Sequence, residues 1–320
     1  MTEHLVSVSR LSVAINGLKA VDDVDISIDK GERVGIIGES GCGKTLTAMA
    51  IAGLLPRSFD VSGEIVVEGR RLDVLPESER RKTRGSQIGF IFQDPHSALD
   101  PTMRIGRQVA EPLRVHIGQP YRKTRDRVFQ LLSDVGLTPA PERAAAYPHE
   151  LSGGQKQRAM IAAAIACNPS LLVADEPTTA LDTTVQKRVL DQLDRVVGST
   201  TALLLISHDI GVIRRMCSRL YVMYGGRIVE HGDTDSVVAQ PRHPYTASLL
   251  AAATLSRGST GEDTYQTVKG TVPALGEFPQ GCRFRDRCER ADEACAVEPR
   301  LEGTLHSVRC WYPNSLDETA

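Results

Sequence analysis

Apolar residues along this chain gather in short segments of two kinds. In the first 30 residues they alternate with polar residues, most strictly at Val24, Ile26 and Ile28, which is typical of strands with one buried face. Later segments are unbroken apolar runs, which predict strands buried on both faces of a sheet. These runs are residues 171–174 and 202–206, and the segment Arg33-Val34-Gly35-Ile36-Ile37 also predicts a buried strand. Segments with helical spacing separate them, so the pattern predicts an α/β fold.

The pattern of apolar and polar residues changes between residues 97 and 160. Two polar segments with helical spacing, 104–116 and 121–135, are joined there by Gly and Pro. We expect an inserted helical region there. A polar, Gly-rich stretch with the sequence LSRGSTGEDTYQ indicates a linker further on. The expected organisation is one α/β domain over residues 1–255, which contains the insertion, and a small C-terminal extension over residues 256–320.

Composition narrows the classes of protein. The chain has 320 residues, a net charge of −2, 41% hydrophobic residues and 24% charged residues, which is an ordinary balance for a folded domain. It lacks the basic character of most nucleic-acid-binding proteins, so nucleic acid is not an expected partner. No apolar run approaches the ~20 residues of a spanning helix, and the N-terminus lacks the layout of a secretory signal. We expect a cytoplasmic protein that reaches a membrane by docking on another protein.

The strand at 33–37 is followed by a glycine-rich loop and a predicted helix at 46–55, and the loop fits the pattern G-x-x-x-x-G-K-[ST]. In this motif, backbone N–H groups curl around phosphate oxygens and the helix N-terminus adds a favourable dipole. Lys44 would contact the β- and γ-phosphates, and the Thr45 hydroxyl would bind Mg²⁺. A chance glycine-rich turn, the alternative, would not explain the flanking strand and helix. The loop comprises Gly38, Glu39, Ser40, Gly41, Cys42, Gly43, Lys44 and Thr45.

Two carboxylates, Asp175 and Glu176, follow the apolar run at 171–174. A strand buried on both faces delivers its C-terminal residues to the ligand edge of a parallel sheet. Asp175 would therefore help to hold Mg²⁺, and Glu176 would orient or deprotonate the attacking water. A strand-end acid that only faces solvent is the alternative for either residue.

A pair of glycines opens a further expected helix at 156–167. Paired glycines at the start of a helix expose backbone N–H groups to an anion, so the chain carries two phosphate-binding elements. Their chemistry is explained if each nucleotide contacts both elements, one from each of two chains. The motif consists of Leu151, Ser152, Gly153, Gly154 and Gln155.

With these motifs in this order, residues 5 to about 250 resemble the ATP-binding-cassette (ABC) ATPases. The sequence LSGGQ at 151–155 looks like the signature motif of that family, and Gln93 looks like its Q-loop. The Ala-Leu-Asp sequence at 180–182 resembles the D-loop, and His208 resembles the switch histidine. The resemblance implies a P-loop NTPase fold with a RecA-like core, an antiparallel β subdomain and the helical insertion.

The resemblance also implies ATP and Mg²⁺ as cofactors and a head-to-tail dimer with two ATP molecules at its interface. Lys44 of one chain would face the 151–155 motif of the other. Gln93 would sense Mg²⁺ or the water and pass closure to a membrane partner, while Asp182 would cross the dimer. His208 would contact the γ-phosphate. The catalytic set implied in this way is Glu176, His208 and Gln93, and the Mg²⁺ ligands are Thr45, Gln93 and Asp175.

One position departs from the family pattern. The family usually places an aromatic residue near position 15, where it stacks on adenine, whereas this chain has Ile15. Stacking of a base on an aromatic ring contributes ~1–3 kcal/mol. We therefore expect weaker affinity and selectivity for the base, with the binding of phosphates unaffected.

Three fragments resemble the branch of the family that imports oligopeptides, dipeptides and nickel. They are Phe92-Gln93-Asp94-Pro95 with Leu99-Asp100-Pro101, Pro148-His149-Glu150, and His243-Pro244-Tyr245-Thr246. The resemblance implies an importer ATPase at the cytoplasmic face of the cell membrane. Its partners would be two permeases, a substrate-binding protein and a sister ATPase subunit, with a homodimer as the alternative. Peptides are the first expected cargo and nickel chelates the second.

Two rival functions belong to other classes. A non-transport ABC ATPase, such as a DNA-repair or translation factor, usually has two fused cassettes or a long coiled coil, and this chain shows neither. A module that binds ATP without hydrolysing it would not need the intact Glu176 and His208.

Four of the seven cysteines lie near the C-terminus, with the spacing C-x5-C-x6-C-x14-C. Clustered thiols in a reducing compartment favour a metal site over disulfides, but this spacing lacks the C-x2-C pairs of most zinc sites. Four thiolates suit a [4Fe–4S] cluster, which some members of the resembled branch carry. That cluster is our first interpretation, with zinc and free thiols as alternatives. The residues are Cys282, Cys288, Cys295 and Cys310.

Overall fold

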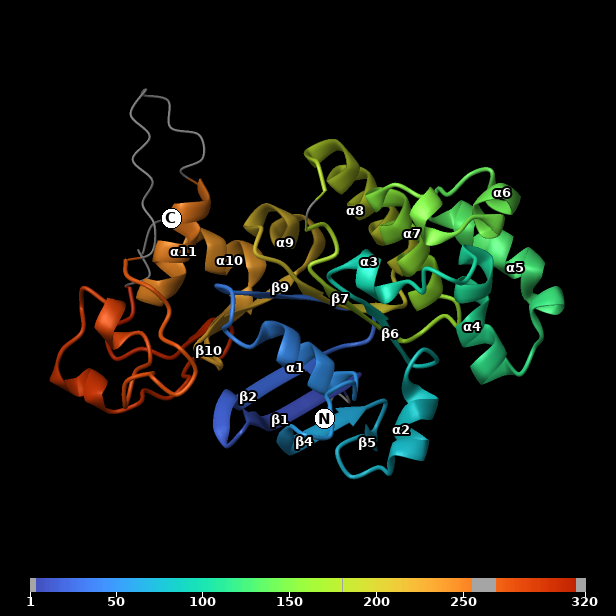
Figure 1. Cartoon of the computed structure of the whole chain (residues 1–320). Helices are drawn as coiled ribbons and strands as arrows, with labels where there is room; N and C mark the ends of the chain where they lie inside the picture. The colour runs from blue at the N-terminus through green and yellow to red at the C-terminus, as the bar shows by residue number, and fades with distance from the viewer. Residues whose placement is uncertain (1–3, 180, 255–268, 315–320) are drawn as a thin grey trace, which may run out of the picture. The chain divides into compact units, whose positions relative to one another are not determined.

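The computed structural model describes residues 4–179, 181–254 and 269–314 (Figure 1). The chain divides into two compact units. The first unit takes in residues 1–5, 28–32 and 74–205, and the second takes in residues 6–27, 33–73 and 206–320. The linker predicted after residue 254 lies outside the described residues.

The first unit contains three adjacent strands in the order β8-β7-β6, with helices around them. β6 and β7 are parallel, and Ile88 pairs with Leu171. Every residue of β7 and β8 is buried, as the unbroken apolar runs predict. The strands are β6 (Ile88–Ile91), β7 (Leu171–Asp175) and β8 (Ala202–Ile206). The helices are α2 (Glu77–Thr83), α3 (Pro95–Ala98), α4 (Ile105–Ile117), α5 (Tyr121–Asp134), α6 (Ala140–Ala145), α7 (Gly153–Ala164) and α8 (Thr183–Val197).

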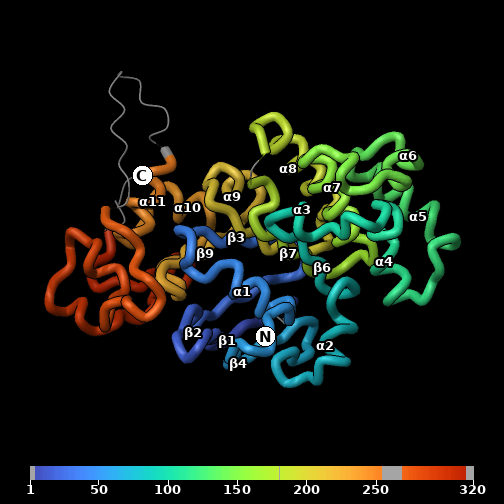
Figure 2. Tube along the Cα trace, in the orientation of Figure 1, coloured from blue at the N-terminus to red at the C-terminus, as the bar shows by residue number. Residues whose placement is uncertain are grey.

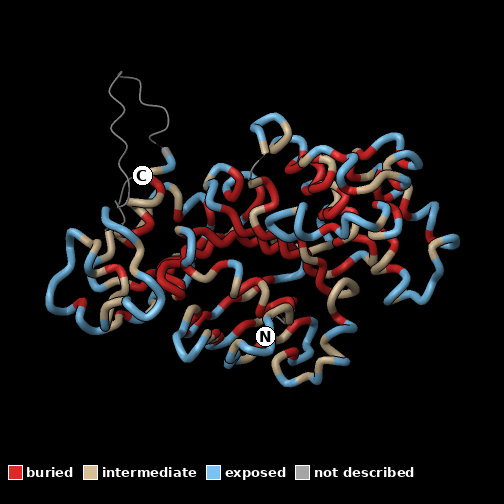
Figure 3. Tube along the Cα trace, viewed as in Figure 1, coloured by how far each residue is buried: buried red, intermediate tan, exposed pale blue. Residues whose placement is uncertain are grey.

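The predicted helical region is present as α4 to α7, which appear in shades of green in Figure 1. α5 shows why the segment folds as a helix against its neighbours. Its buried residues Thr124, Val128, Leu131 and Leu132 recur at helical spacing and form one face. Burying a Val or Leu side chain contributes roughly 1.5–3 kcal/mol, while the opposite face remains exposed (Figure 3). α4 packs against both α5 and α7.

The second unit contains an antiparallel sheet in the order β2-β1-β4-β5. Val6 of β1 pairs with Val67 of β4, and a bulge interrupts the ladder between Ser9 and Ser12. This sheet confirms the prediction that the N-terminal segments with alternating apolar residues form strands. Its strands are β1 (Val6–Ile15), β2 (Leu18–Ile28), β4 (Asp60–Val67) and β5 (Arg70–Arg71).

A further run of strands in this unit has the order β11-β10-β9-β3. β3 is parallel to β9, while β10 is antiparallel to β9 and to β11. The strands are β3 (Arg33–Ile37), β9 (Arg219–Tyr224), β10 (Arg227–Asp233) and β11 (Ser307–Val308). The helices are α1 (Lys44–Ile51), α9 (Ile210–Met216), α10 (Thr234–Ala239) and α11 (Pro244–Thr254).

The C-terminal extension, described over residues 269–314, is mostly irregular and follows α11 in the orange-to-red part of Figure 2. It contains two short 3₁₀ turns, at Arg285–Arg287 and Glu293–Ala296, and the strand β11. β11 pairs with β10, and Phe284, Cys295 and Val308 are buried. The extension is therefore anchored by backbone pairing and a small apolar core.

Within these described residues, no helix is both long and apolar enough to cross a membrane. The α/β class, the antiparallel sheet and the helical region all agree with the fold expected from the sequence.

Candidate functional site

The glycine-rich loop lies between β3 and α1 in the second unit, as its motif requires. Gly38 has a φ of 155°, and a Cβ there would lie 2.1 Å from the Met223 carbonyl oxygen, so the loop can pass this strand only with glycine. Gly43 is the N-cap of α1 with a φ of 101°, and no side chain caps the helix there. The first-turn N–H groups of α1 therefore point toward the loop without a capping side chain, which suits an anion.

The loop encloses the ammonium group of its own lysine. Lys44 is 6% exposed, and its Nζ donates to the carbonyl oxygens of Gly38 at 2.8 Å and Glu39 at 2.9 Å. Burial raises the pKa of the Cys42 thiol although the Lys44 ammonium acts against that rise. Cys42 is therefore a protonated, buried residue of the loop and has no thiolate character near neutral pH.

Glu39 is held by two residues that the sequence did not nominate for the site. Its backbone N–H donates to the Tyr245 hydroxyl at 2.8 Å. Its carboxylate accepts two hydrogen bonds from the Arg287 guanidinium, at 2.7 and 3.0 Å. Tyr245 belongs to the His-Pro-Tyr-Thr segment noted in the sequence, whereas nothing in the local pattern singles out Arg287.

Most of the remaining predicted residues of this unit are exposed. Ser40, Gly41 and Thr45 are exposed, as expected of groups that meet a ligand from solvent. His208 is exposed just after β8, and the next residue, Asp209, caps α9 by accepting the N–H groups of Gly211 and Val212. Ile15, where an aromatic residue was expected, ends β1.

The two strand-end carboxylates lie in the first unit, at the end of β7. Asp175 is its last residue and is 3% exposed. Glu176 follows with a φ of 46°, in the left-handed region that a non-glycine residue seldom occupies. Its Oε2 accepts hydrogen bonds from Gln93 Nε2 at 3.0 Å and from Thr179 Oγ1 at 2.8 Å. The structure thus places two side chains on the Glu176 carboxylate, Gln93 and Thr179, and the sequence did not predict either contact.

The signature-like motif forms the start of α7, also in the first unit. Ser152 is the N-cap, and its Oγ accepts the Gln155 N–H while Gln155 Oε1 accepts the Ser152 N–H. This reciprocal capping box fixes the helix start. Gly153 is uncrowded among the described residues, since a Cβ there would meet Leu181 Cδ2 at an ordinary contact distance of 3.8 Å. Gly154 is crowded, because a Cβ there would lie 2.4 Å from Val185 Cγ1 of α8.

Asp182, the expected D-loop aspartate, is the N-cap of α8. Its Oδ1 accepts the N–H groups of Thr184 at 3.1 Å and Val185 at 2.9 Å. Asp182 remains exposed while it caps the helix. Ala180, the first residue of the expected D-loop, lies outside the described residues.

The four C-terminal cysteines line one small cavity of about 10 Å³, together with His243 and Phe284. Burial raises the pKa of Cys282 to about 12 and also raises the pKa values of Cys288 and Cys310. Over residues 4–179, 181–254 and 269–314, no group of three or more His, Cys, Asp or Glu side chains is placed so that it could hold a metal ion. The expected ligands share a cavity, but they are not arranged as a metal site.

Comparison with known proteins gives two matching families. The family described as "ABC transporter" matches residues 21–179, and the family described as "Oligopeptide/dipeptide transporter, C-terminal region" matches residues 229–295. The oligopeptide transport ATP-binding protein OppD of Haemophilus influenzae is 41% identical over 295 residues, covering 91% of each chain. The oligopeptide transport ATP-binding protein AppD of Bacillus subtilis is 42% identical over 300 residues, covering 92% of this chain and 91% of its own.

Among solved structures, the chain is similar to an ATP-binding cassette determined as a dimer in a post-hydrolysis state with ADP and Pi bound. The TM-score is 0.64 at 28% sequence identity, and the match covers 72% of this chain and 98% of the other.

Proposed function

Because this chain belongs to the ATP-binding-cassette transporter family, we propose that it is the ATP-hydrolysing subunit that energises an importer of oligopeptides or dipeptides. The observation that carries the ATPase activity is the Glu176 carboxylate, which follows a buried strand and is oriented by Gln93 and Thr179. The assignment of peptides as the cargo rests on two comparisons. They are the similarity to oligopeptide transport proteins and the match of the C-terminal region to an oligopeptide/dipeptide transporter family.

In this proposal the loop from Gly38 to Thr45 binds the phosphates of ATP. Lys44 places its charge on the β- and γ-phosphates, and Thr45, Gln93 and Asp175 would hold Mg²⁺, which would neutralise charge on the phosphates. Glu176 accepts a proton from the attacking water or orients it, with Gln93 beside it. His208 contacts the γ-phosphate.

The second half of the nucleotide site comes from another chain in a head-to-tail dimer. There, the N–H groups at the start of α7, from Ser152 to Gln155, bind the γ-phosphate, and Asp182 lies at the dimer interface. The solved dimer of a similar cassette supports this arrangement.

We further propose that the chain works at the cytoplasmic face of the membrane with two permeases, a sister ATPase subunit and a substrate-binding protein. A nickel-chelate importer is the second candidate for the complex. Affinity purification of the tagged chain from solubilised membranes tests the assembly. Recovery of permeases and a binding protein is expected, whereas recovery from the soluble fraction alone would contradict it.

The Glu176→Gln variant tests the ATPase proposal. The amide keeps the shape of the carboxylate and its contact with Thr179, but it cannot accept the proton. We expect ATP hydrolysis to fall by at least about 100-fold, a size typical of a lost general base, with ATP binding retained and a closed dimer trapped by ATP. Phosphate release and gel filtration with ATP measure the two effects. Turnover equal to that of the wild type would refute the role of Glu176.

A [4Fe–4S] cluster at the four cysteines remains a separate proposal. It is supported by the shared cavity of the four thiols, but their placement does not form a metal site as it stands, so cluster binding would require the segment to rearrange. Anaerobic purification followed by iron and acid-labile sulfide assays tests it. Colourless protein that contains neither would end the proposal.

A further inference from the structure

An arginine of the C-terminal extension, Arg287, contacts the phosphate-binding loop. Arg287 lies in the 3₁₀ turn Arg285–Arg287, 248 residues after Glu39 in the sequence. Its two terminal nitrogens donate to the two oxygens of the Glu39 carboxylate, at 2.7 and 3.0 Å. This is the bidentate geometry in which arginine binds a carboxylate most strongly and with the most defined orientation.

Contacts other than the one with Glu39 also hold the Arg287 guanidinium in place. The Arg287 side chain is only 5% exposed, and its Nε donates to the Lys269 carbonyl at 2.7 Å. It also lies over the rings of Tyr224 and Phe284, with centroid distances of 5.6 and 5.8 Å. A group held on all these sides presents its donors in one place, so it can impose a position on its partner.

Glu39 passes this constraint into the loop. Its carboxylate is held by Arg287 and its N–H by Tyr245, while its own carbonyl accepts a hydrogen bond from Lys44 Nζ at 2.9 Å. Glu39 therefore links Arg287 directly to Lys44, the lysine assigned to the phosphates. Displacing Glu39 would displace one of the two carbonyls that hold the Lys44 ammonium.

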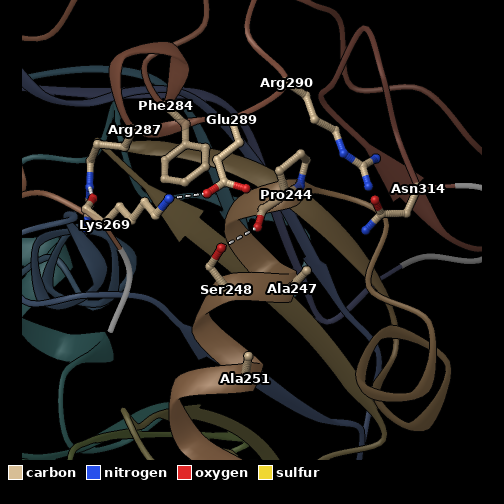
Figure 4. A pocket seen from close by; sticks show the side chains of 10 residues that line it. All are labelled: Pro244, Ala247, Ser248, Ala251, Lys269, Phe284, Arg287, Glu289, Arg290 and Asn314. Carbon is tan, nitrogen blue, oxygen red and sulfur yellow. Dashed lines mark hydrogen bonds and ion pairs between the residues drawn. The ribbon is translucent and has the colours of Figure 1, made fainter. Parts of the chain in front are cut away.

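Arg287 also borders an open cavity of about 660 Å³ between α11 and the extension (Figure 4). Pro244, Ala247, Ser248 and Ala251 of α11 form one wall of this cavity, and Lys269, Phe284 and Glu289 contribute to the other. Figure 4 shows Arg287 beside Lys269, whose ammonium pairs with Glu289. The guanidinium thus lies between this cavity and the phosphate loop.

Other side chains dock the extension without bonding directly to the loop, although Gly226, next to one of their partners, donates its N–H to the Cys42 carbonyl at 3.0 Å. Arg283 donates to Asp22 at 2.7 Å and to the Gly225 carbonyl, and β11 pairs with β10. Docking and loop contact are therefore carried by different arginines. This separation makes the role of Arg287 testable apart from the stability of the extension.

We propose that Arg287 is a positioning residue of the nucleotide site, through which the C-terminal extension holds Glu39 and Lys44 of the phosphate loop in the shape that binds ATP. The inference rests on the proposed binding of ATP by this loop. It assigns the extension a part in the ATPase site in addition to any part in assembly.

The test is Mg·ATP binding by the full chain, measured by calorimetry in the non-hydrolysing Glu176→Gln parent. We expect the dissociation constant to rise about tenfold in Arg287→Ala, because the variant leaves a half-buried carboxylate without its partner. Arg287→Lys keeps the charge but loses the fork, so an intermediate rise of about threefold is expected. Arg283→Ala should lower the unfolding temperature and leave the dissociation constant within about twofold of the parent. Arg290 also lines the cavity beside Arg287, and Arg290→Ala should likewise leave the dissociation constant within about twofold of the parent.

A double-mutant cycle with Glu39→Gln completes the design. If Arg287 acts through Glu39, the double variant should bind ATP no more weakly than Arg287→Ala alone. Multiplied effects, or an unchanged dissociation constant in Arg287→Ala, would overturn the inference. An equal loss in Arg283→Ala would also overturn it, by showing that docking alone matters. A parent that binds no ATP would instead refute the proposed function, and this inference with it.

Discussion

At the scale of single residues, the candidate catalytic carboxylate is held in a costly conformation. A non-glycine residue with a φ of 46°, such as Glu176, is disfavoured by about 1–3 kcal/mol. It persists because neighbouring groups fix it, and the two hydrogen bonds from Gln93 and Thr179 to one carboxylate oxygen are such groups. The result is a carboxylate whose Oε2 is held in one place by two donors, which suits a group that must orient a water.

The Thr179→Val variant tests this orientation. Valine has the shape of threonine but lacks the hydroxyl that donates to Glu176 Oε2 at 2.8 Å. Because a hydrogen bond to a charged group contributes about 1.5–3 kcal/mol, we expect kcat for ATP hydrolysis to fall about tenfold or more, with the KM for ATP within about twofold. Steady-state kinetics measure both constants. Thr179→Ser retains the hydroxyl and should restore most of the activity, whereas wild-type kcat in the valine variant would show that the hydroxyl does not orient Glu176.

At the scale of secondary-structure elements, the expected functional segments coincide with helix starts. Ser152 caps α7, Asp182 caps α8 and Asp209 caps α9. An N-cap side chain contributes about 0.5–2 kcal/mol to stability. The same polar residues thus stabilise helices and stand beside groups that we assign to the nucleotide, so their replacement would change both stability and activity.

Gly154 offers a way to separate these two effects. An alanine there would place its Cβ 2.4 Å from Val185 Cγ1, where α7 meets α8, and overpacking of this kind typically costs about 1–3 kcal/mol. We expect Gly154→Ala to lower the urea midpoint of unfolding. Adding Val185→Ala removes the clashing methyl groups, so the double variant should be less destabilised than the sum of the two single variants.

Additive losses of unfolding free energy would contradict the packing explanation for Gly154. If the double variant recovers stability but not ATP hydrolysis, the glycine has a separate role at the nucleotide. Urea unfolding and phosphate release on the same preparations distinguish these outcomes.

The elements themselves were largely predictable from the sequence, because burial leaves a local signature. The unbroken apolar run at 202–206 predicted a fully buried strand and matches β8, and the polar segment at 121–135 matches α5 within one residue. The start of α7 was predicted three residues late, because the capping box admits glycines into the first turn.

The contacts between distant side chains were not predictable in this way. Tyr245 and Arg287 meet Glu39 across 206 and 248 residues of sequence. Hydrophobic periodicity says which face of an element is buried, but not which polar tips meet when two elements pack. The roles assigned to Gln93 and His208 came from the family resemblance, since a lone glutamine or histidine has no distinctive local pattern.

At the scale of the whole molecule, charge pairing joins the C-terminal extension to the rest of the second unit. Asp22 receives hydrogen bonds from Lys19, Arg227 and Arg283. Burial opposes its negative charge, but the hydrogen bonds from Lys19 and Arg227 bring its pKa below the ordinary value. With Arg287 on Glu39, two carboxylates near the loop are thus held by arginines that lie far along the chain.

A buried histidine makes the stability of this arrangement depend on pH. His243 is 1% exposed, and its Nδ1 accepts the Tyr245 N–H at the start of α11. Burial lowers its pKa from 6.5 to about 4, although Glu230 and a hydrogen bond with the Arg309 backbone act in the opposite direction. Glu230 lies beside His243 and accepts hydrogen bonds from the His243 backbone N–H and from the His306 side chain.

Since the pKa of His243 is lower in the folded chain, the unfolded chain takes up the proton first as the pH falls. The stabilisation is therefore fully present above about pH 6.5 and is lost between pH 6.5 and about 4. At 1.36 kcal/mol for each pKa unit, the loss approaches roughly 3 kcal/mol at the acid end. Urea unfolding between pH 7.5 and 5 measures the slope in the wild type.

The His243→Asn variant isolates the contribution of the imidazole. Asparagine is a favoured N-cap residue that can accept the same N–H at the start of α11, but it does not titrate. The carboxylates and other histidines are common to both proteins, so their effects cancel in the difference. We expect the unfolding free energy of the wild type to fall more steeply with acid than that of the variant, and the two curves to converge as the pH falls. Parallel curves would show that His243 is not the group whose protonation drives the loss.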